Sequence, residues 1–306
     1  MLALAVAAAV AYETDQLTDR DRPLADAVLP ANARMDVELA AAAAETNRIV
    51  GCEADVNFQR HVLATQVAIL TGRREAVPRR GLARQFGFGR YGAWLEESPE
   101  IERREFDDRS DVFGGVTMND SVILRLAGPC STILLAGVLI GTDKLDHFLD
   151  TGYHYTQRVD ADAALRFGTR TERTYYGLWT SKAFSYADLA ANSGGYRFYE
   201  GLLGPDSVMQ RDDQGCVVQA RPFDWSSWVT PEWDEVLNPS VYTSRVGRSI
   251  GTHIRASADR YCAAWQALEG VAYQDHLAAL TIPAYVQGRS PPRSDPFDLQ
   301  DVCGSR

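Results

Sequence analysis

A short polar stripe inside an apolar stretch constrains the fold of this chain more than any other feature. Residues 141–155 read GTDKLDHFLDTGYHY, and Asp143, His147, Asp150 and His154 follow one another at steps of four, three and four. On an α-helix these steps place all four side chains along one face. The apolar and aromatic residues between them indicate that part of the helix is buried. The segment therefore predicts a helix that presents a polar stripe to a partner element.

Two carboxylates and two imidazoles along one helix face can serve four purposes. They can bind a divalent metal such as zinc, manganese or iron, with a partner helix completing the coordination shell. They can form an Asp–His pair for acid/base catalysis, or a buried hydrogen-bond network that only fixes helix packing. They can also lie on a solvated surface. The spacing alone does not choose among these four interpretations.

A second segment carries residues that could complete such a site. Residues 184–195 read FSYADLAANSGG, and Ser185 followed three residues later by Asp188 is a helix-start pattern. Asp188 and Asn192 are then one turn apart on the same face. We expect this helix to bring a carboxylate and an orienting amide to His147, although Asp188 can also serve only as part of the helix cap.

The two segments together resemble a pattern of exported or membrane-associated helical proteins of unknown function. The matching residues read DKxxHF over 143–148 and FSxxDxxANxxG over 184–195. The first of these motifs is also similar to one in the VanZ-like membrane family. The resemblance implies an envelope location and helices that bring five residues together: Asp143, Lys144, His147, Asp188 and Asn192. The chain differs from the VanZ-like pattern because it lacks clear membrane spans.

The charge balance argues against one broad class of partner. The 306 residues carry a formal net charge of -10, and an acidic surface repels the phosphate backbone of nucleic acids. Nucleic-acid binding is therefore not expected. The composition is otherwise that of a globular protein, with 45% hydrophobic and 24% charged residues.

The start of the chain and its cysteines bear on location. Residues 1–11 read MLALAVAAAVA, which has the apolar stretch and the small-x-small ending of a secretion signal. None of the five cysteines forms a C-x-x-C pair, so a cysteine-rich zinc site is not expected. In an exported chain, one or two disulfides with one thiol left over are expected, and buried free thiols are the alternative. We expect export to the periplasm or cell envelope.

One further segment tests whether the chain spans a membrane. Residues 122–140 are nearly long enough to cross a bilayer, but they contain Arg125 and a Gly128–Pro129 break. An internal charge costs at least ~2.5 kcal/mol in the bilayer, and the break leaves backbone groups unsatisfied in lipid. A buried helix or strand pair is therefore predicted here, and no membrane span.

The remaining pattern predicts a mainly α fold, in which one helical domain over 12–290 carries a small β-hairpin insertion. Helical spacing predicts helices over 37–48, 57–70, 142–159, 185–199 and 246–268. The turn-like DDQG between short apolar runs predicts the hairpin over 208–219. The proline-containing residues 291–306 are expected to form a loose C-terminal tail.

A tryptophan-rich stretch over 223–242 permits two interpretations. Trp225, Trp228 and Trp233 could line a carbohydrate or peptide groove together with the acidic pair Asp234 and Glu235. Alternatively, the tryptophans are core residues beneath a loop.

Two functional hypotheses follow from these features. In the first, the protein is a metal-dependent or acid/base hydrolase acting on a small molecule or an envelope component. Asp143, His147 and Asp188 would act as ligands or base, Asp150 and His154 would complete the metal site, and Lys144 and Asn192 would support it. In the second, the protein is a non-enzymatic envelope protein whose Asp/His stripe is a helix-packing network and whose aromatic region binds a partner.

Overall fold

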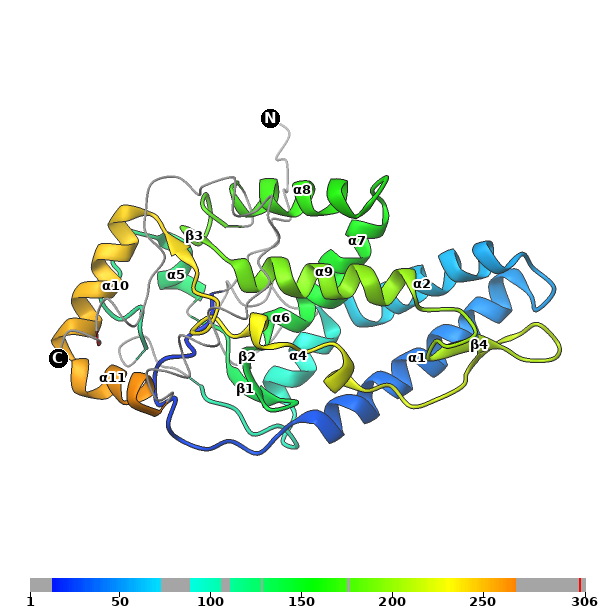
Figure 1. The fold of residues 1–306 in the computed structure, drawn as a ribbon, viewed down its shortest axis with the longest axis horizontal. Helices are drawn as coiled ribbons and strands as arrows, with labels where there is room; N and C mark the ends of the chain where they lie inside the picture. Colours follow the sequence, from blue (N-terminus) through cyan, green and yellow to red (C-terminus); the bar gives the residue numbers. More distant parts are fainter. Residues whose placement is uncertain are drawn as a thin grey trace.

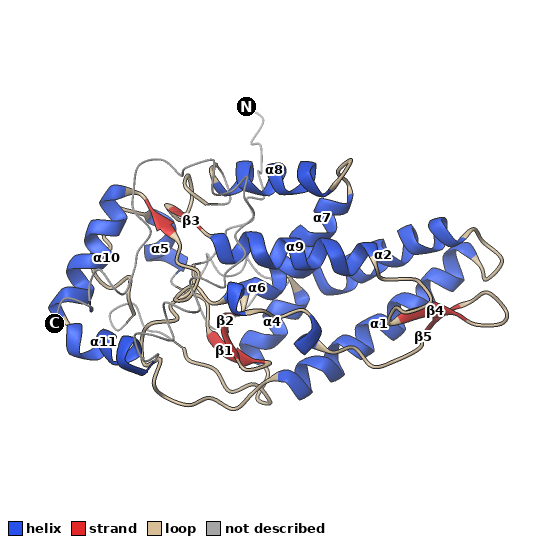
Figure 2. Cartoon of the chain, viewed as in Figure 1, coloured by secondary structure: helices blue, strands red, loops and turns tan. Residues whose placement is uncertain are grey.

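The computed structural model describes residues 13–72, 89–105, 111–127, 129–174 and 177–267, together with Cys303. Helices dominate these residues and the strands are short (Figure 2). The prediction of a mainly α fold is therefore confirmed. The expected signal segment and most of the C-terminal tail lie outside the described residues.

The helices form an elongated arrangement, with α1 and α2 packed side by side at one end and α10 and α11 at the other (Figure 1). Between them, α9 lies against the short helices that carry the polar stripe. The helices are α1 (Val28–Val50), α2 (Val56–Gly72), α4 (Arg90–Glu97), α5 (Val122–Ala127), α6 (Asp143–Asp146), α7 (Gly152–Thr156), α8 (Ala161–Glu172), α9 (Tyr186–Glu200), α10 (Ser244–Ala256) and α11 (Ala258–Ala267). A π-helical turn, η2 (His147–Thr151), joins α6 to α7, and two 3₁₀ turns are η3 (Trp225–Ser227) and η4 (Pro231–Trp233).

Three antiparallel strand pairs complete the described fold. They are β1 (Thr132–Leu135) with β2 (Val138–Gly141), β3 (Ala183–Phe184) with β6 (Val241–Tyr242), and β4 (Met209–Arg211) with β5 (Val217–Gln219). The β4–β5 pair confirms the predicted hairpin. The segment tested as a membrane span forms α5 and the β1–β2 hairpin instead. Among the described residues, no helix is both long enough and apolar enough to cross a bilayer.

The predicted helix over 142–159 is divided by the π-helical turn η2. A π turn inserts one extra residue into the helix, which rotates everything after it by about 100° relative to an unbroken α-helix. The predicted helix over 246–268 is likewise divided, with α10 ending before Ser257 and α11 beginning at Ala258.

Two glycines allow η2 and α7 to lie very close to α9. A Cβ added to Gly195 would lie 1.9 Å from the carbonyl oxygen of Phe148, and a Cβ added to Gly152 would lie 2.6 Å from the Cα of Gly195. Neither position has room for a methyl group. This close approach holds His147 near the first two turns of α9, where Asp188 lies.

The tryptophan-rich stretch belongs to the core. Trp225 and Trp233 are buried, and the Phe148 ring packs against Trp225, Trp228 and Trp233 with ring centroids 5.1–5.7 Å apart. The interpretation of Trp225 and Trp233 as core residues is therefore confirmed. Their packing fixes the helix that carries the polar stripe, because Phe148 follows His147 directly.

The cysteines form two disulfides and leave one thiol. Cys52 pairs with Cys216, which ties the α1–α2 connection to the β4–β5 hairpin, and Cys262 pairs with Cys303. Cys130 is free and buried. Of the two alternatives for the cysteines, the structure has disulfides with one thiol left over.

Substituting Gly195→Ala is predicted to lower the free energy of unfolding by about 3 kcal/mol, because the new methyl group overlaps backbone atoms of η2. Urea unfolding followed by circular dichroism measures this change. Gly247→Ala in α10 is the matched control, since its Cβ would meet nothing closer than 3.6 Å and alanine favours the helix. Equal unfolding midpoints for the two variants would contradict the close helix approach.

The disulfide pairing predicts one reactive thiol per chain when protein purified without reductant is denatured. Reduction before the assay should raise the count to five, which is the total number of cysteines. A thiol reagent such as dithionitrobenzoate gives both counts. Five thiols before reduction would show that the chain carries no disulfide.

Candidate metal centre

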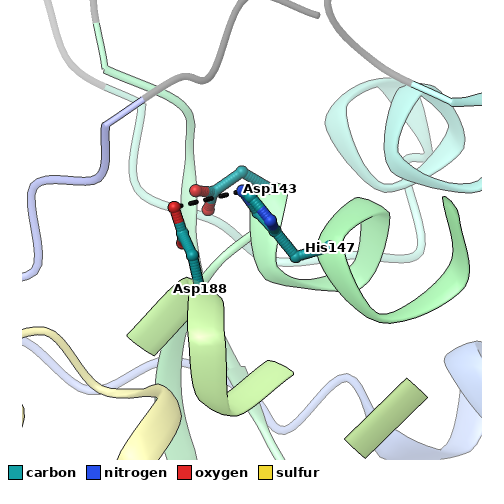
Figure 3. Close-up of side chains that lie close together, drawn as sticks. All are labelled: Asp143, His147 and Asp188. Carbon is teal, nitrogen blue, oxygen red and sulfur yellow. Dashed lines mark ion pairs between the residues drawn. The ribbon is translucent and has the colours of Figure 1, made fainter. Parts of the chain in front are cut away.

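The helix stripe and α9 bring three metal-binding side chains together. Asp143, His147 and Asp188 each offer one ligand atom, and these atoms all lie within 4.8 Å of one another. Figure 3 shows the three side chains converging from the two helices. The Nε2 atom of His147 lies 3.1 Å from Oδ2 of Asp188. The structure therefore places Asp188 beside His147, as expected from the sequence.

Lys144 places a cation beside the same carboxylates. Its Nζ atom lies 2.7 Å from Oδ2 of Asp143, from Oδ1 of Asp188 and from Oε1 of Glu235. The lysine side chain has no solvent exposure, and the three carboxylates are 3–6% exposed. An ammonium group buried this deeply needs such partners, because leaving it unpaired costs several kcal/mol.

The ring of His147 is held in one orientation by hydrogen bonds on its other side. Nδ1 lies 3.1 Å from Oδ1 of Asn192, and the Asn192 amide nitrogen donates to the hydroxyl of Tyr155 at 3.2 Å. The amide oxygen is thus directed at the ring, so that Nδ1 carries the proton and donates it. Gly168 leaves room for the Tyr155 hydroxyl, which a Cβ there would overlap at 1.5 Å. His147 therefore presents Nε2 to the carboxylates.

The second oxygen of Asp143 is also held. The Thr14 hydroxyl donates to Oδ1 of Asp143 at 2.9 Å, and the Cys130 thiol lies 3.2 Å from the same oxygen. Thr14 comes from the chain before α1, and Cys130 lies two residues before the start of β1. Segments far apart in the sequence thus fix the position of one carboxylate, which is the kind of outer support that ligand residues need.

The start of α9 fixes Asp188. The Ser185 hydroxyl accepts a hydrogen bond from the Asp188 backbone N–H at 3.1 Å and donates to Oε1 of Glu235 at 3.2 Å. The predicted helix start at Ser185 is therefore confirmed. The Asp188 side chain makes no capping hydrogen bond in these contacts. Its carboxylate faces Lys144 and His147.

The neighbouring charges decide the protonation of His147 and Asp188. Burial disfavours the charged ring of His147, but the surrounding carboxylates, chiefly Asp188 and then Glu172 and Asp143, together outweigh it and raise the pKa of His147 to about 10. Burial likewise opposes ionisation of Asp188, but His147 and Lys144 lower its pKa below the ordinary value. Without a metal, the pair is therefore a protonated imidazole and a carboxylate at neutral pH.

Other buried carboxyls around the centre retain protons more readily. Burial raises the pKa of Glu235, opposed by Lys144, and burial also raises the pKa of Glu172 and of Glu13. Glu235 and Thr14 additionally line a cavity of about 30 Å³, which has room for one water molecule. The centre is therefore richer in carboxyl groups than its lysine and histidine can neutralise.

Asp150 and His154 do not join the group formed by Asp143, His147 and Asp188. They pair with each other at 3.8 Å, and their side chains are 36% and 46% exposed. Asp150 and His154 follow Asp143 by seven and eleven residues, which is about 10 and 16 Å along a helix axis and too far to share one metal ion with it; the π turn also rotates them relative to Asp143. The Asp146 side chain has a different partner: its Oδ2 accepts a hydrogen bond from the Gly89 N–H at 2.8 Å.

Sequence reasoning assigned Lys144 and Asn192 to the site, and both contact it. It missed Glu235, which was considered only as part of a carbohydrate groove, and it missed Thr14, Cys130 and Tyr155. Thr142, which directly precedes Asp143, makes no helix-cap hydrogen bond, because its hydroxyl donates to Glu96. No local spacing links Glu235, Thr14 or Cys130 to the stripe, since these contacts are made by tertiary folding, whereas Tyr155 lies within residues 141–155 themselves.

The three ligand atoms fit a divalent cation of intermediate hardness. Two carboxylate oxygens and one imidazole nitrogen suit zinc, manganese or iron(II). Lys144 competes with a metal for Asp143 and Asp188. It pairs with only one oxygen of each carboxylate, so the second oxygen of each could bind the metal. Comparisons with protein-family models, with curated proteins and with solved structures found no match.

The raised pKa values predict that the metal-free protein loses stability as the pH rises. The pKa of Asp146 rises from 3.8 to about 7, mainly through burial, and that of His147 rises from 6.5 to about 10. The folded state therefore binds more protons than the unfolded state over this range, and the free energy of unfolding falls between about pH 4 and pH 10. Urea unfolding midpoints of chelator-treated protein measure this slope.

Asp146→Asn removes the Asp146 contribution, because an amide cannot ionise. The variant should show a shallower decline between about pH 4 and pH 7, where Glu235 and Glu172 still contribute, and keep the decline above pH 7. A wild-type stability that rises between pH 7 and pH 10 would contradict the assigned protonation states.

Proposed function

We propose that Asp143, His147 and Asp188 bind one divalent cation, and that the protein is a metal-dependent hydrolase acting outside the cytoplasm. The observation that carries the proposal is the convergence of three ligand atoms within 4.8 Å, with the remaining ring nitrogen of His147 held by Asn192. Histidine ligands of metals commonly have their second nitrogen fixed in this way.

Three protein ligands are the arrangement of a catalytic site, because positions stay open for water and substrate. A bound divalent cation supplies a water of lowered pKa and polarises the bond to be hydrolysed. The side chains of Asp143 and Asp188 supply charge, while Asn192 and Tyr155 keep the His147 ring in place. The proposed substrate is a small molecule or an envelope component.

Lys144 has a defined part in this proposal. Its ammonium pairs with the buried carboxylates of Asp143 and Asp188 and so fixes their positions. Glu235 is its third carboxylate partner. Coordination by His147 requires the neutral ring, so metal binding at neutral pH releases a proton from Nε2. Metal affinity should therefore rise with pH as the proton becomes easier to remove.

A metal-free acid/base mechanism is less well supported. A base must be unprotonated near neutral pH, whereas the Asp188 carboxylate keeps His147 protonated by raising its pKa to about 10. In the absence of a metal, His147 would donate a proton rather than accept one.

The extracytoplasmic location is supported by three features. Two disulfides link distant parts of the chain, and disulfides persist in oxidising compartments. The sequence of residues 1–11 is typical of a secretion signal, and the two motifs resemble those of exported or membrane-associated proteins.

The second candidate function is that of a non-enzymatic envelope protein. It is favoured by the complete burial of Lys144 among three carboxylates, because a closed ion network can serve helix packing alone. In that case the cluster would join α6, α9 and the segment after η4, and function would reside in a binding surface elsewhere.

Metal content of the purified protein separates the two candidates. About one equivalent of zinc, manganese or iron per chain is expected after incubation with the metal and removal of the excess. His147→Ala should lose it, and Asp188→Asn should weaken it. His154→Ala is the matched control, because this exposed histidine lies seven residues further along the same helical segment and outside the group.

Circular dichroism of each variant shows whether it folds. If wild type and His154→Ala bind no metal, and His147→Ala lowers the melting temperature strongly, the metal site is refuted and the packing network is favoured. If metal is bound equally by His147→Ala and wild type, the ion lies elsewhere and the proposed ligands are wrong.

A further inference from the structure

A second, larger cavity lies between α1 and α4, and it is lined by different residues from those of the candidate metal centre. Its volume is about 520 Å³, which is within the range of small-molecule sites. Arg34 of α1 and one face of α4 form most of its lining, together with the turn that follows α4. Neither of the two functions considered above uses this cavity.

The residues of α4 that line the cavity change from basic to acidic along the helix. Arg90, Trp94 and Glu97 are spaced at four and three residues, so they lie along one face. Arg90 is in the first turn and Glu97 in the last. At 1.5 Å per residue, their backbone positions are ~10 Å apart along the helix axis. The cavity therefore has a basic end, an aromatic middle and an acidic end.

Arg34 adds a second guanidinium group to the cavity lining, beside Trp94. One terminal nitrogen pairs with Glu38, its neighbour one turn along α1, and the guanidinium lies over the Trp94 ring at 5.8 Å from the centroid. Its Nε atom is buried and has no hydrogen-bond partner among the residues that the structure describes. The guanidinium is thus held in place by Glu38 and Trp94 while one of its donors stays unsatisfied.

The acidic end carries two carboxylates that pair with no basic residue in the described part of the chain. Glu97 and Glu100 are exposed, and neither forms an ion pair with a residue in the part of the chain that the structure describes. The residue before Glu97 faces the opposite way, since Glu96 accepts hydrogen bonds from the backbone and hydroxyl of Ser131 at 2.8 Å. One face of α4 thus supports the core, and the other presents the cavity.

We propose that this cavity binds a short zwitterionic peptide with a free carboxyl and a free amino end. The carboxylate binds at Arg34 and Arg90, because a guanidinium group matches a carboxylate in shape and charge. An apolar or aromatic side chain packs on Trp94, and the ammonium group binds at Glu97 and Glu100. A span of ~10 Å suits an extended chain of about three residues.

Binding of the tripeptide Ala-Phe-Ala to the full-length protein tests the proposal by isothermal titration calorimetry. N-acetylated and C-amidated forms of the same tripeptide remove one terminal charge each. We expect each modification to weaken binding by about 10-fold or more, since each removes a charge-assisted interaction. Glu97→Gln should weaken the unmodified peptide but change the affinity of the N-acetylated form little.

Arg34→Gln should weaken binding of the unmodified tripeptide by about 10-fold. Arg48→Gln is the matched control, because Arg48 is exposed on the same helix and pairs with Glu45 away from the cavity. Equal affinity of Ala-Phe-Ala for the Arg34→Gln and Arg48→Gln variants would overturn the proposal. So would equal affinity of the blocked and free peptides, or absence of binding at about 10 mM peptide.

The assay is independent of the metal centre. His147→Ala protein should bind Ala-Phe-Ala as wild type does, so failure of the metal proposal leaves the result for the peptide cavity unchanged. Loss of peptide binding in folded His147→Ala protein would contradict a separate cavity.

Discussion

A lysine ammonium without solvent contact is stable only when negative groups surround it, because its removal from water costs several kcal/mol. Lys144 meets this requirement through three carboxylates at 2.7 Å, which come from the same helix, from α9 and from the chain after η4. Each of these elements must be in place before the ammonium can be buried. The ion cluster and the positions of α6, α9 and the tryptophan-rich stretch are therefore interdependent.

The same contacts determine what the centre can do. Lys144 occupies one oxygen of Asp143 and one of Asp188, and His147 pairs with the other oxygen of Asp188. A cation that bound there would replace the proton on His147 rather than the ammonium of Lys144. The additional carboxyls Glu13, Glu172 and Glu235, whose pKa values are raised chiefly by burial, could then ionise as local positive charge increased.

Packing supports this electrostatic arrangement. Phe148 extends from the residue next to His147 into a cluster of tryptophan rings, and Gly152 and Gly195 permit backbone contact between α7 and α9. Apolar packing thus fixes the helix backbones, and the hydrogen bonds of Asn192 and Thr14 fix the side chains. A functional site needs both kinds of support to hold its geometry.

The spacing of residues along the sequence predicted which side chains share a helix face. The step of four residues between Asp143 and His147, and that between Asp188 and Asn192, placed these pairs on helix faces. The sequence pattern did not show the π turn over His147–Thr151, and the shared helix face grouped Asp150 and His154 with the others although they lie about 10 and 16 Å beyond Asp143 along the helix axis. Glu235 was assigned to a groove because its partner, Lys144, lies 91 residues away along the chain.

The most direct test of the metal centre is a crystal structure of protein soaked with manganese or zinc, recorded at the absorption edge of the metal. The account predicts one anomalous peak about 2.0–2.2 Å from Nε2 of His147 and from one carboxylate oxygen each of Asp143 and Asp188, with Lys144 still bound to Glu235. Density that shows His147 and Asp188 in direct contact, with no anomalous peak between them at full metal saturation, would contradict it.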